Sequence, residues 1–134
     1  MKTVFVDTNV ILDVFLKREG FWQDSFEIFK LANLYWINAY FSASSMTDIF
    51  YIIKKRLSIS KSREAVNKLL NLFQIVGVDG YDLRCALSIP INDLEDALQV
   101  RCAQKANADI IITNDINGFT GIDIPVMTPT EFIT

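Results

Sequence analysis

Short continuous apolar runs alternate along the chain with longer segments in which apolar residues recur every three or four positions. A continuous run is typical of a parallel strand covered on both faces, whereas the recurrence is typical of a helix with one buried side. The runs predict five strands, at residues 2–6, 36–41, 74–78, 110–113 and 124–127.

The recurring pattern predicts helices between these strands. They are expected at residues 10–16, around a stripe of Trp22, Phe26 and Phe29, from a cap at Ser44 or Ser45 to near Arg56, from Ser60 or Ser62 to Phe73, at residues 81–87, and from Asp93 to about Ala106 with Asn92 as its cap. Because one or two helices separate successive strands, the strands pair in parallel through crossovers, and the class is α/β.

Composition limits the kind of protein this can be. With 134 residues, 51% of them hydrophobic, the chain can bury one core but not two, so residues 1–134 are expected to form a single domain. Its longest apolar runs fall well below the roughly 20 residues of a membrane span, and its N-terminus lacks a separate apolar segment. We therefore expect a soluble, cytoplasmic protein that does not interact with membranes, with Cys85 and Cys102 as core fillers.

The absence of histidine narrows the chemistry further. It excludes Ser-His-Asp, Cys-His and His-zinc mechanisms. The five glycines are scattered, and their spacing matches no glycine-rich loop that binds nucleotide phosphates. Carboxylates, hydroxyls and amides remain, which are the ligands of hard cations such as Mg²⁺ or Mn²⁺. A formal charge of −3 argues against binding nucleic acid by net positive charge alone, but does not exclude a nuclease.

Several acids occupy positions where ligands bind in α/β sheets. Asp7 follows the first strand and Asp115 follows the strand at 110–113, so both are placed at the carboxyl edge of the sheet. Asp93 and Asp96 share one face of a first helical turn, and Asp48 lies early in another helix.

Several of the acids also have a simpler interpretation. Asp7 makes a good helix N-cap, and first-turn acids such as Asp93 and Glu95 complement the helix dipole, which we take to be the role of Glu95. Gathering several carboxylates in one crevice raises their pKa values, and a divalent cation removes that penalty. The pattern therefore predicts metal-dependent phosphodiester hydrolysis.

The candidate acids lie in four segments: Val4 to Asp13, Ser42 to Asp48, Asp93 to Gln99, and Ile110 to Asp115 with Phe119. In this order the segments resemble the PIN-domain ribonucleases, and in particular the VapC-type toxins of bacterial toxin-antitoxin pairs. The resemblance implies a three-layer α/β/α fold with a central parallel five-stranded sheet of order 3-2-1-4-5. It further implies an Mg²⁺ or Mn²⁺ site, endonucleolytic cleavage of an RNA substrate, an antitoxin partner and a homodimer.

Site roles follow from the resemblance position by position. Asp7 and Asp96 are expected to be the principal metal ligands, and Asp48 and Asp115 to complete the catalytic acids. The expected supporting residues are Asn9, Asp93 and Thr113. The chain departs from the family at Asp48, where glutamate is usual, and at Asn114, where a basic residue is common.

The remaining candidates are one further acid, the aromatic stripe and three basic clusters. Asp13, six residues after Asp7, is expected to be solvated, and the aromatic stripe with Phe21 is expected to lie in the core, although an antitoxin helix or second protomer could use part of it. The basic clusters could line an RNA path or merely complement helix dipoles; they are Lys17 with Arg18, Lys54 to Arg56, and Lys61 with Arg63.

Two other functions fit the same residues. One is a haloacid-dehalogenase-type phosphatase with Asp7 as nucleophile, although Asn9 stands where such enzymes want a second acid. The other is a catalytically silent PIN-like module that only binds a protein.

Overall fold

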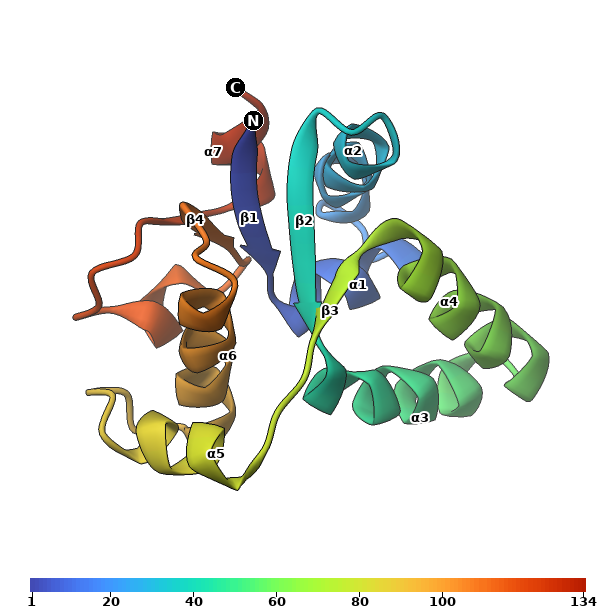
Figure 1. Cartoon of the computed structure of the whole chain (residues 1–134). Coiled ribbons are helices and arrows are strands. Elements are labelled where there is room, and N and C mark those ends of the chain that lie inside the picture. Colours follow the sequence, from blue (N-terminus) through green and yellow to red (C-terminus); the bar gives the residue numbers. More distant parts are fainter.

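The structure is a computed structural model that describes residues 1–134. A single parallel sheet runs through its centre in the order β3-β2-β1-β4-β5 (Figure 1). Its strands are β1 (Lys2–Val6), β2 (Ile37–Ser42), β3 (Gln74–Val76), β4 (Ile110–Ile112) and β5 (Val126–Met127). The predicted α/β class and the strand order implied by the family resemblance are confirmed.

Helices cover both faces of this sheet. One face carries α1 (Thr8–Phe15), α2 (Trp22–Asn33), α3 (Met46–Arg56), α4 (Ile59–Leu72) and the short α7 (Pro129–Ile133). The other carries α6 (Leu94–Lys105) and the 3₁₀ turn η2 (Ile116–Phe119), and α5 (Gly80–Leu87) packs against α6. A further 3₁₀ turn, η1 (Ala43–Ser45), joins β2 to α3.

The first strand shows why the molecule has three layers. Successive side chains of a strand point to opposite faces. Val4 and Val6 pack in the core beneath α1 to α4, whereas Phe5 packs in the core beneath α6. All three side chains are fully buried, as the continuous apolar run predicts.

Several helix ends differ from the sequence prediction. Asp93, not Asn92, caps α6, and its Oδ1 accepts a hydrogen bond from the Asp96 backbone N–H at 3.0 Å. Ser58, not Ser60 or Ser62, caps α4. In both cases the residue just before the helix has the extended backbone that an N-cap requires, so the cap is fixed by where the chain turns. Helix α7 was not predicted.

The aromatic stripe of α2 is only partly in the core, contrary to prediction. Phe29 is buried, but Phe21 is 50% and Phe26 40% exposed. Phe26 lies at the edge of the core, with its ring centroid 6.4 Å from that of Phe29. The stripe therefore extends beyond the side of α2 that is fully buried.

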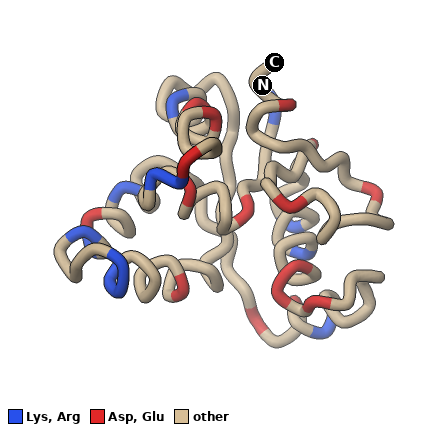
Figure 2. The backbone as a smooth tube through the Cα atoms, turned by 180° about the vertical axis from the view of Figure 1, so that it is seen from behind, with Lys and Arg blue, Asp and Glu red and all other residues tan.

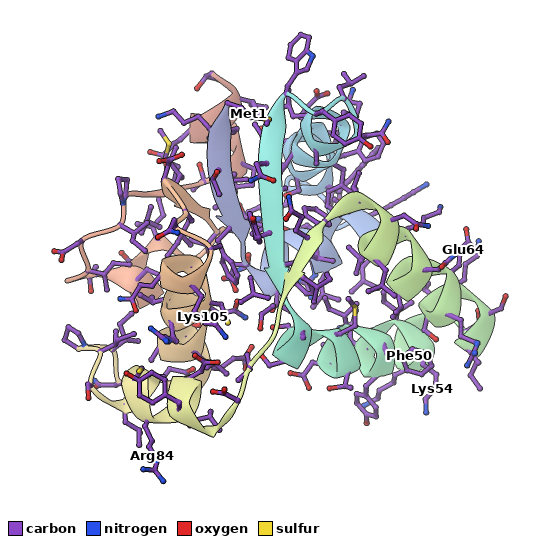
Figure 3. The ribbon with its side chains drawn as sticks, in the orientation of Figure 1. Met1, Phe50, Lys54, Glu64, Arg84 and Lys105 are labelled. Atoms are coloured by element: carbon purple, nitrogen blue, oxygen red, sulfur yellow. The ribbon has the colours of Figure 1, made fainter.

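An ion-pair cluster joins α5 to α6. The carboxylate of Asp82 is buried and accepts hydrogen bonds from Arg101 at 3.0 Å and Lys105 at 2.7 Å. These bonds hold the pKa of Asp82 well below its usual range. Lys105, labelled on α6 in Figure 3, also donates to the Gly77 carbonyl and so ties α6 to the segment after β3.

None of the helices combines the length and the apolar character needed to cross a membrane.

Candidate active site

Asp7 lies at the carboxyl end of β1 and is buried. It caps α1, because its Oδ1 accepts a hydrogen bond from the Thr8 backbone N–H at 2.8 Å. Its Oδ2 accepts a second hydrogen bond, also 2.8 Å long, from the hydroxyl of Thr113. The capping role and the site role considered for Asp7 are therefore compatible, and both bonds fix the direction of its carboxylate.

Thr113 connects Asp7 to the segment that follows β4. Its fully buried Oγ1 accepts hydrogen bonds from the Asp115 backbone N–H at 3.0 Å and from the Asn9 side-chain amide at 3.3 Å. The Oδ1 of Asn9 in turn accepts from the backbone N–H of Asn114 at 3.2 Å. Adjacent parallel strands β1 and β4 thus end in one hydrogen-bonded network.

Asp96 and Asp115 point toward a common position beside Gly118. A Cβ atom at Gly118 would lie 3.0 Å from Oδ2 of Asp115 and 3.1 Å from Oδ2 of Asp96. No hydrogen bond within the protein occupies either carboxylate, although Asp115 precedes a 3₁₀ turn that it could cap. Glycine therefore leaves open a space between two carboxylates with free oxygens.

Electrostatics couple these acids to Asp7. Burial, together with the charges of Glu95 and Asp115, raises the pKa of Asp7 to about 6, against the lowering effect of its bonds to Thr113 and Thr8. Burial and the charges of Asp93, Asp7, Asp115 and Glu95 raise the pKa of Asp96 to about 6 as well. Burial and mutual repulsion thus both favour the protonated form of these two carboxylates.

The remaining predicted acids lie around this centre. Asp48 is exposed in the first turn of α3, and its charge raises the pKa of Glu95, although burial contributes more to that shift. Asp93 is the cap of α6, a role that was expected of Asn92. Glu95, which sequence reasoning assigned to the helix dipole, lies close enough to act on the pKa values of Asp7 and Asp96.

Sequence reasoning missed the polar contacts that hold these elements together. Gln99 is buried on α6, and its side-chain amide donates to Ser45 at 2.8 Å and to Thr8 at 3.2 Å. It thus joins the helix of Asp96 to the residue after Asp7 and to the turn before α3. A glutamine among the apolar residues of a buried helix was the available signal.

Asp13 is buried, although it was expected to be solvated. Its carboxylate accepts hydrogen bonds from Arg18, Ser25 and Asn114. Two of these partners, Ser25 and Asn114, are distant in sequence, so the local sequence around Asp13 could not predict its burial.

The donor set fits Mg²⁺ or Mn²⁺. No three acidic side chains lie close enough to enclose an ion by themselves. Mg²⁺ does not require that, because it is usually held by one or two carboxylates and keeps several waters. Asp7, Asp96 and Asp115 offer hard oxygen ligands, and Gly118 leaves the space open. Burial and neighbouring negative charges raise the pKa values of Asp7 and Asp96, and a bound cation would offset both effects.

Comparison with known proteins gives a consistent family. A family model described as PIN domain matches residues 3–117. Ribonuclease VapC1 from Aquifex aeolicus is 28% identical over 134 residues, which covers 96% of this chain and 92% of that protein.

Solved structures share the fold. The chain superposes with a TM-score of 0.69 and 22% identity on a toxin-antitoxin complex from Klebsiella pneumoniae, over 94% of this chain and 97% of that one. VapBC2 from Rickettsia felis bound to a promoter DNA fragment gives a TM-score of 0.70 at 16% identity, over 94% and 98% of the two chains.

Proposed function

This chain belongs to the PIN domain family, and from that premise we propose that it is an Mg²⁺- or Mn²⁺-dependent endoribonuclease and the toxin of a toxin-antitoxin pair. The observation that carries the proposal is the convergence of Asp96 and Asp115 on Gly118, in electrostatic contact with Asp7. In a chain without histidine, such a cluster is suited to a hard cation and to phosphodiester hydrolysis.

The protein side chains orient the site. Thr8 and Thr113 hold the Asp7 carboxylate in one direction, and Asn9 holds Thr113 and Asn114. Asp7 and Asp96 would bind the metal, with Asp115 and Asp48 at the more exposed edge and Asp93 fixing the start of α6. When bound, the ion supplies Lewis-acid polarisation of a phosphoryl oxygen and lowers the pKa of water.

Cleavage of a structured RNA in Mg²⁺ tests the proposal. The native protein should cut the RNA internally, EDTA should stop it, and Asp7→Asn or Asp96→Asn should reduce the rate at least about 100-fold. Cleavage that survives both substitutions would overturn the assignment. A phosphoryl group trapped on Asp7 would instead support the phosphatase, and absence of Mn²⁺ binding by calorimetry would support the silent binding module.

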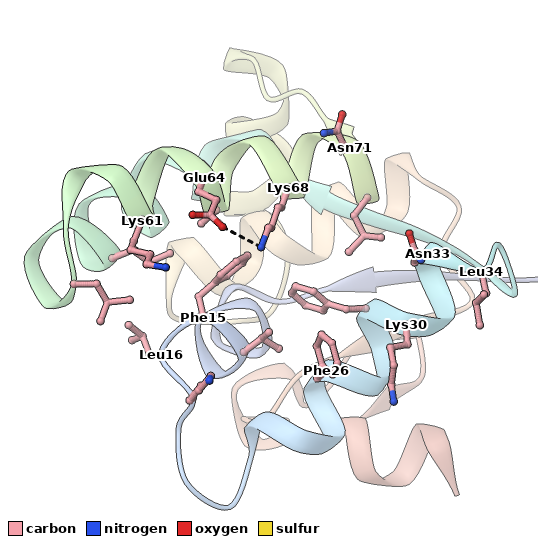
Figure 4. Close-up of a pocket in the computed structure, with 17 residues that line it drawn as sticks. Phe15, Leu16, Phe26, Lys30, Asn33, Leu34, Lys61, Glu64, Lys68 and Asn71 are labelled. Carbon is pink, nitrogen blue, oxygen red and sulfur yellow. Dashed lines mark ion pairs between the residues drawn. The ribbon is translucent and has the colours of Figure 1, made fainter.

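A groove between the α1–α2 and α3–α4 helix pairs fits an antitoxin segment (Figure 4). It has a volume of about 900 Å³, and apolar side chains such as Phe15, Phe26 and Phe29 line it. The charged residues around it are four lysines and one glutamate: Lys17, Lys30, Lys61, Lys68 and Glu64. An amphipathic helix with an apolar face and acidic flanks matches this lining.

Co-expression tests this partner assignment. The protein encoded beside this gene should co-purify with the native chain, and Phe26→Glu should abolish co-purification. Tyr81→Glu is the matched control, because it replaces an exposed aromatic residue on α5, away from the groove, and it should leave co-purification intact. Equal binding by both variants would exclude the groove.

The basic residues at the end of α3 offer an RNA path. Figure 2 shows basic positions along the α3–α4 pair, and Lys54, Lys55 and Arg56 form the last turn of α3, which begins at the acidic site. Arg18 is less available, because it lies 3.4 Å from Asp13. Reversing the charges of Lys54 to Arg56 should weaken RNA binding and reduce its salt dependence.

A homodimer is the second assembly that we propose. Exposed apolar side chains on α3 and α4, including Tyr51, Ile59 and Leu70, would be covered in it. Analytical ultracentrifugation should give twice the mass of the 15.3 kDa chain.

A further inference from the structure

The buried carboxylate of Asp13 stands apart from the acids of the proposed active site. Asp13 is 3% exposed and lies on α1, four residues after Asn9. Burying a carboxylate is unfavourable unless it is paired and hydrogen-bonded. Arg18 and Ser25 each lie 3.4 Å from its oxygens, so a cation and a hydroxyl hold it.

The third partner of Asp13 connects it to the site. The Asn114 side-chain amide donates to Oδ2 of Asp13, and Asn114 lies between Thr113 and Asp115. The backbone N–H of Asn114 donates to the side chain of Asn9. Asn9 and Asp13 lie on the same face of α1, because residues four apart are neighbours on a helix. Helix α1 therefore accepts two hydrogen bonds from Asn114, one from its backbone N–H and one from its side-chain amide.

The segment from Thr113 to Asp115, which these two bonds hold, carries two groups of the proposed active site. Thr113 donates to Asp7, and the Asp115 carboxylate lies beside Gly118. A shift of Asn114 would move both, since Asp115 also donates its backbone N–H to Thr113. A leucine at position 13 could fill this interior position, but it could not accept a hydrogen bond.

We infer that Asp13 is a positioning residue: held by Arg18 and Ser25, it fixes Asn114 and thereby the Thr113–Asp115 segment of the active site. The inference rests on the proposed ribonuclease function for its catalytic consequence. The ordering of the segment can be measured without metal or RNA.

The test compares Asp13→Ala and Asn114→Ala with the native protein. In each variant kcat for RNA cleavage should fall about 10- to 100-fold while KM changes little, as for other residues that orient a metal ligand. The double variant should lose no more than the worse single variant, because both substitutions break one contact. Asp13→Asn, which keeps an oxygen acceptor, should retain more activity than Asp13→Ala.

Amide hydrogen exchange in EDTA provides the second readout. The backbone amides of Asn114 and Asp115 should exchange faster in Asp13→Ala and in Asn114→Ala. Asp82→Ala is the matched control, because Asp82 is also buried and paired with an arginine but lies between α5 and α6. It should lower Tm and leave exchange at Asn114 and Asp115 unchanged. Asn117→Ala, an exposed asparagine of the next turn, controls for Asn114→Ala.

The outcomes separate this inference from the proposed function. If the native protein cleaves RNA but Asn114→Ala leaves kcat and the Asp115 amide unchanged, Asp13 is not a positioning residue. The same conclusion follows if Asp82→Ala accelerates exchange at Asp115 as much as Asp13→Ala does. If the native protein does not cleave RNA, the ribonuclease proposal fails, and the exchange data still decide whether Asp13 orders the segment.

Discussion

At the scale of single residues, Asp7 serves the fold and the proposed chemistry at once. One carboxylate oxygen caps α1 and the other binds Thr113. The folded chain therefore orients the carboxylate before any cation arrives. The cost is a buried charge, which is visible in its raised pKa.

The raised pKa values of Asp7 and Asp96 predict how stability depends on pH. Both are raised from 3.8 to about 6, so the folded state binds more protons than the unfolded state between these values. This contribution is fully present below pH 3.8 and is lost as pH rises through about 6. In EDTA, the free energy of unfolding measured with urea should fall across this interval. For the buried Asp7 the loss is about 1 to 3 kcal/mol, since one pKa unit is about 1.4 kcal/mol.

Replacing Asp7 isolates its share of this pH dependence. Asp7→Asn should make the metal-free protein more stable than native at pH 7.5, because a neutral amide avoids the cost of burying a charge. The difference should vanish near pH 4. A variant less stable than native at every pH would mean that the hydrogen bonds of Asp7 outweigh its desolvation.

Glu95 gives a separate residue-scale prediction. Its charge raises the pKa values of Asp7 and Asp96, so Glu95→Gln should lower both and shift the pH dependence of Mn²⁺ binding to lower pH. Glu131→Gln, another first-turn acid, is the matched control. Calorimetric titrations at several pH values measure the shift. Weaker binding at every pH would instead make Glu95 a metal ligand.

At the scale of elements, the site depends on how closely η2 approaches the first turn of α6. Gly118 allows this approach because it has no Cβ between Asp96 and Asp115. The starting points of α1 and α6 are fixed by their N-caps, which are Asp7 for α1 and Asp93 for α6. Helix starts, more than helix centres, therefore determine the geometry of the acids.

A substitution at Gly118 tests this geometry. Gly118→Ala should weaken Mn²⁺ binding and RNA cleavage about 10-fold or more, because the methyl group displaces two carboxylates. Gly77→Ala is the control, since a Cβ there meets no atom within 4 Å. Both variants should keep Tm close to native. Native activity in Gly118→Ala would show that this space is not used.

At the scale of the whole molecule, the site is a meeting point of separate elements. Its acids come from the end of β1, the starts of α3 and α6, and the segment after β4. A bound cation would hold these elements together, and its binding energy would add to the stability of the fold.

Thermal unfolding with and without metal tests this coupling. Mn²⁺ at about 100 times its Kd should stabilise the native protein by about 2.7 kcal/mol, and EDTA should reverse the effect. The double variant with Asp7→Asn and Asp96→Asn should show no rise in Tm. An equal rise in that variant would place the metal elsewhere.

Periodicity alone was sufficient for the class, the strands and most helices, since a strand or helix is recognised from residues that are neighbours in sequence. The acids at strand ends and helix starts could be named for the same reason. The short helix α7 and the cap at Ser58 were missed, because few residues carry their signal and the turn of the chain decides between adjacent candidates.

The sequence by itself determined the sheet, its parallel pairing and the set of acids available for chemistry. Only the tertiary structure decided which polar residues are buried together. Asp13 meets Asn114 across 101 positions, and Gln99 meets Thr8 across 91. Burial of a polar group is favourable only when a partner is present, and such a partner is chosen by the packing of distant elements rather than by the local pattern.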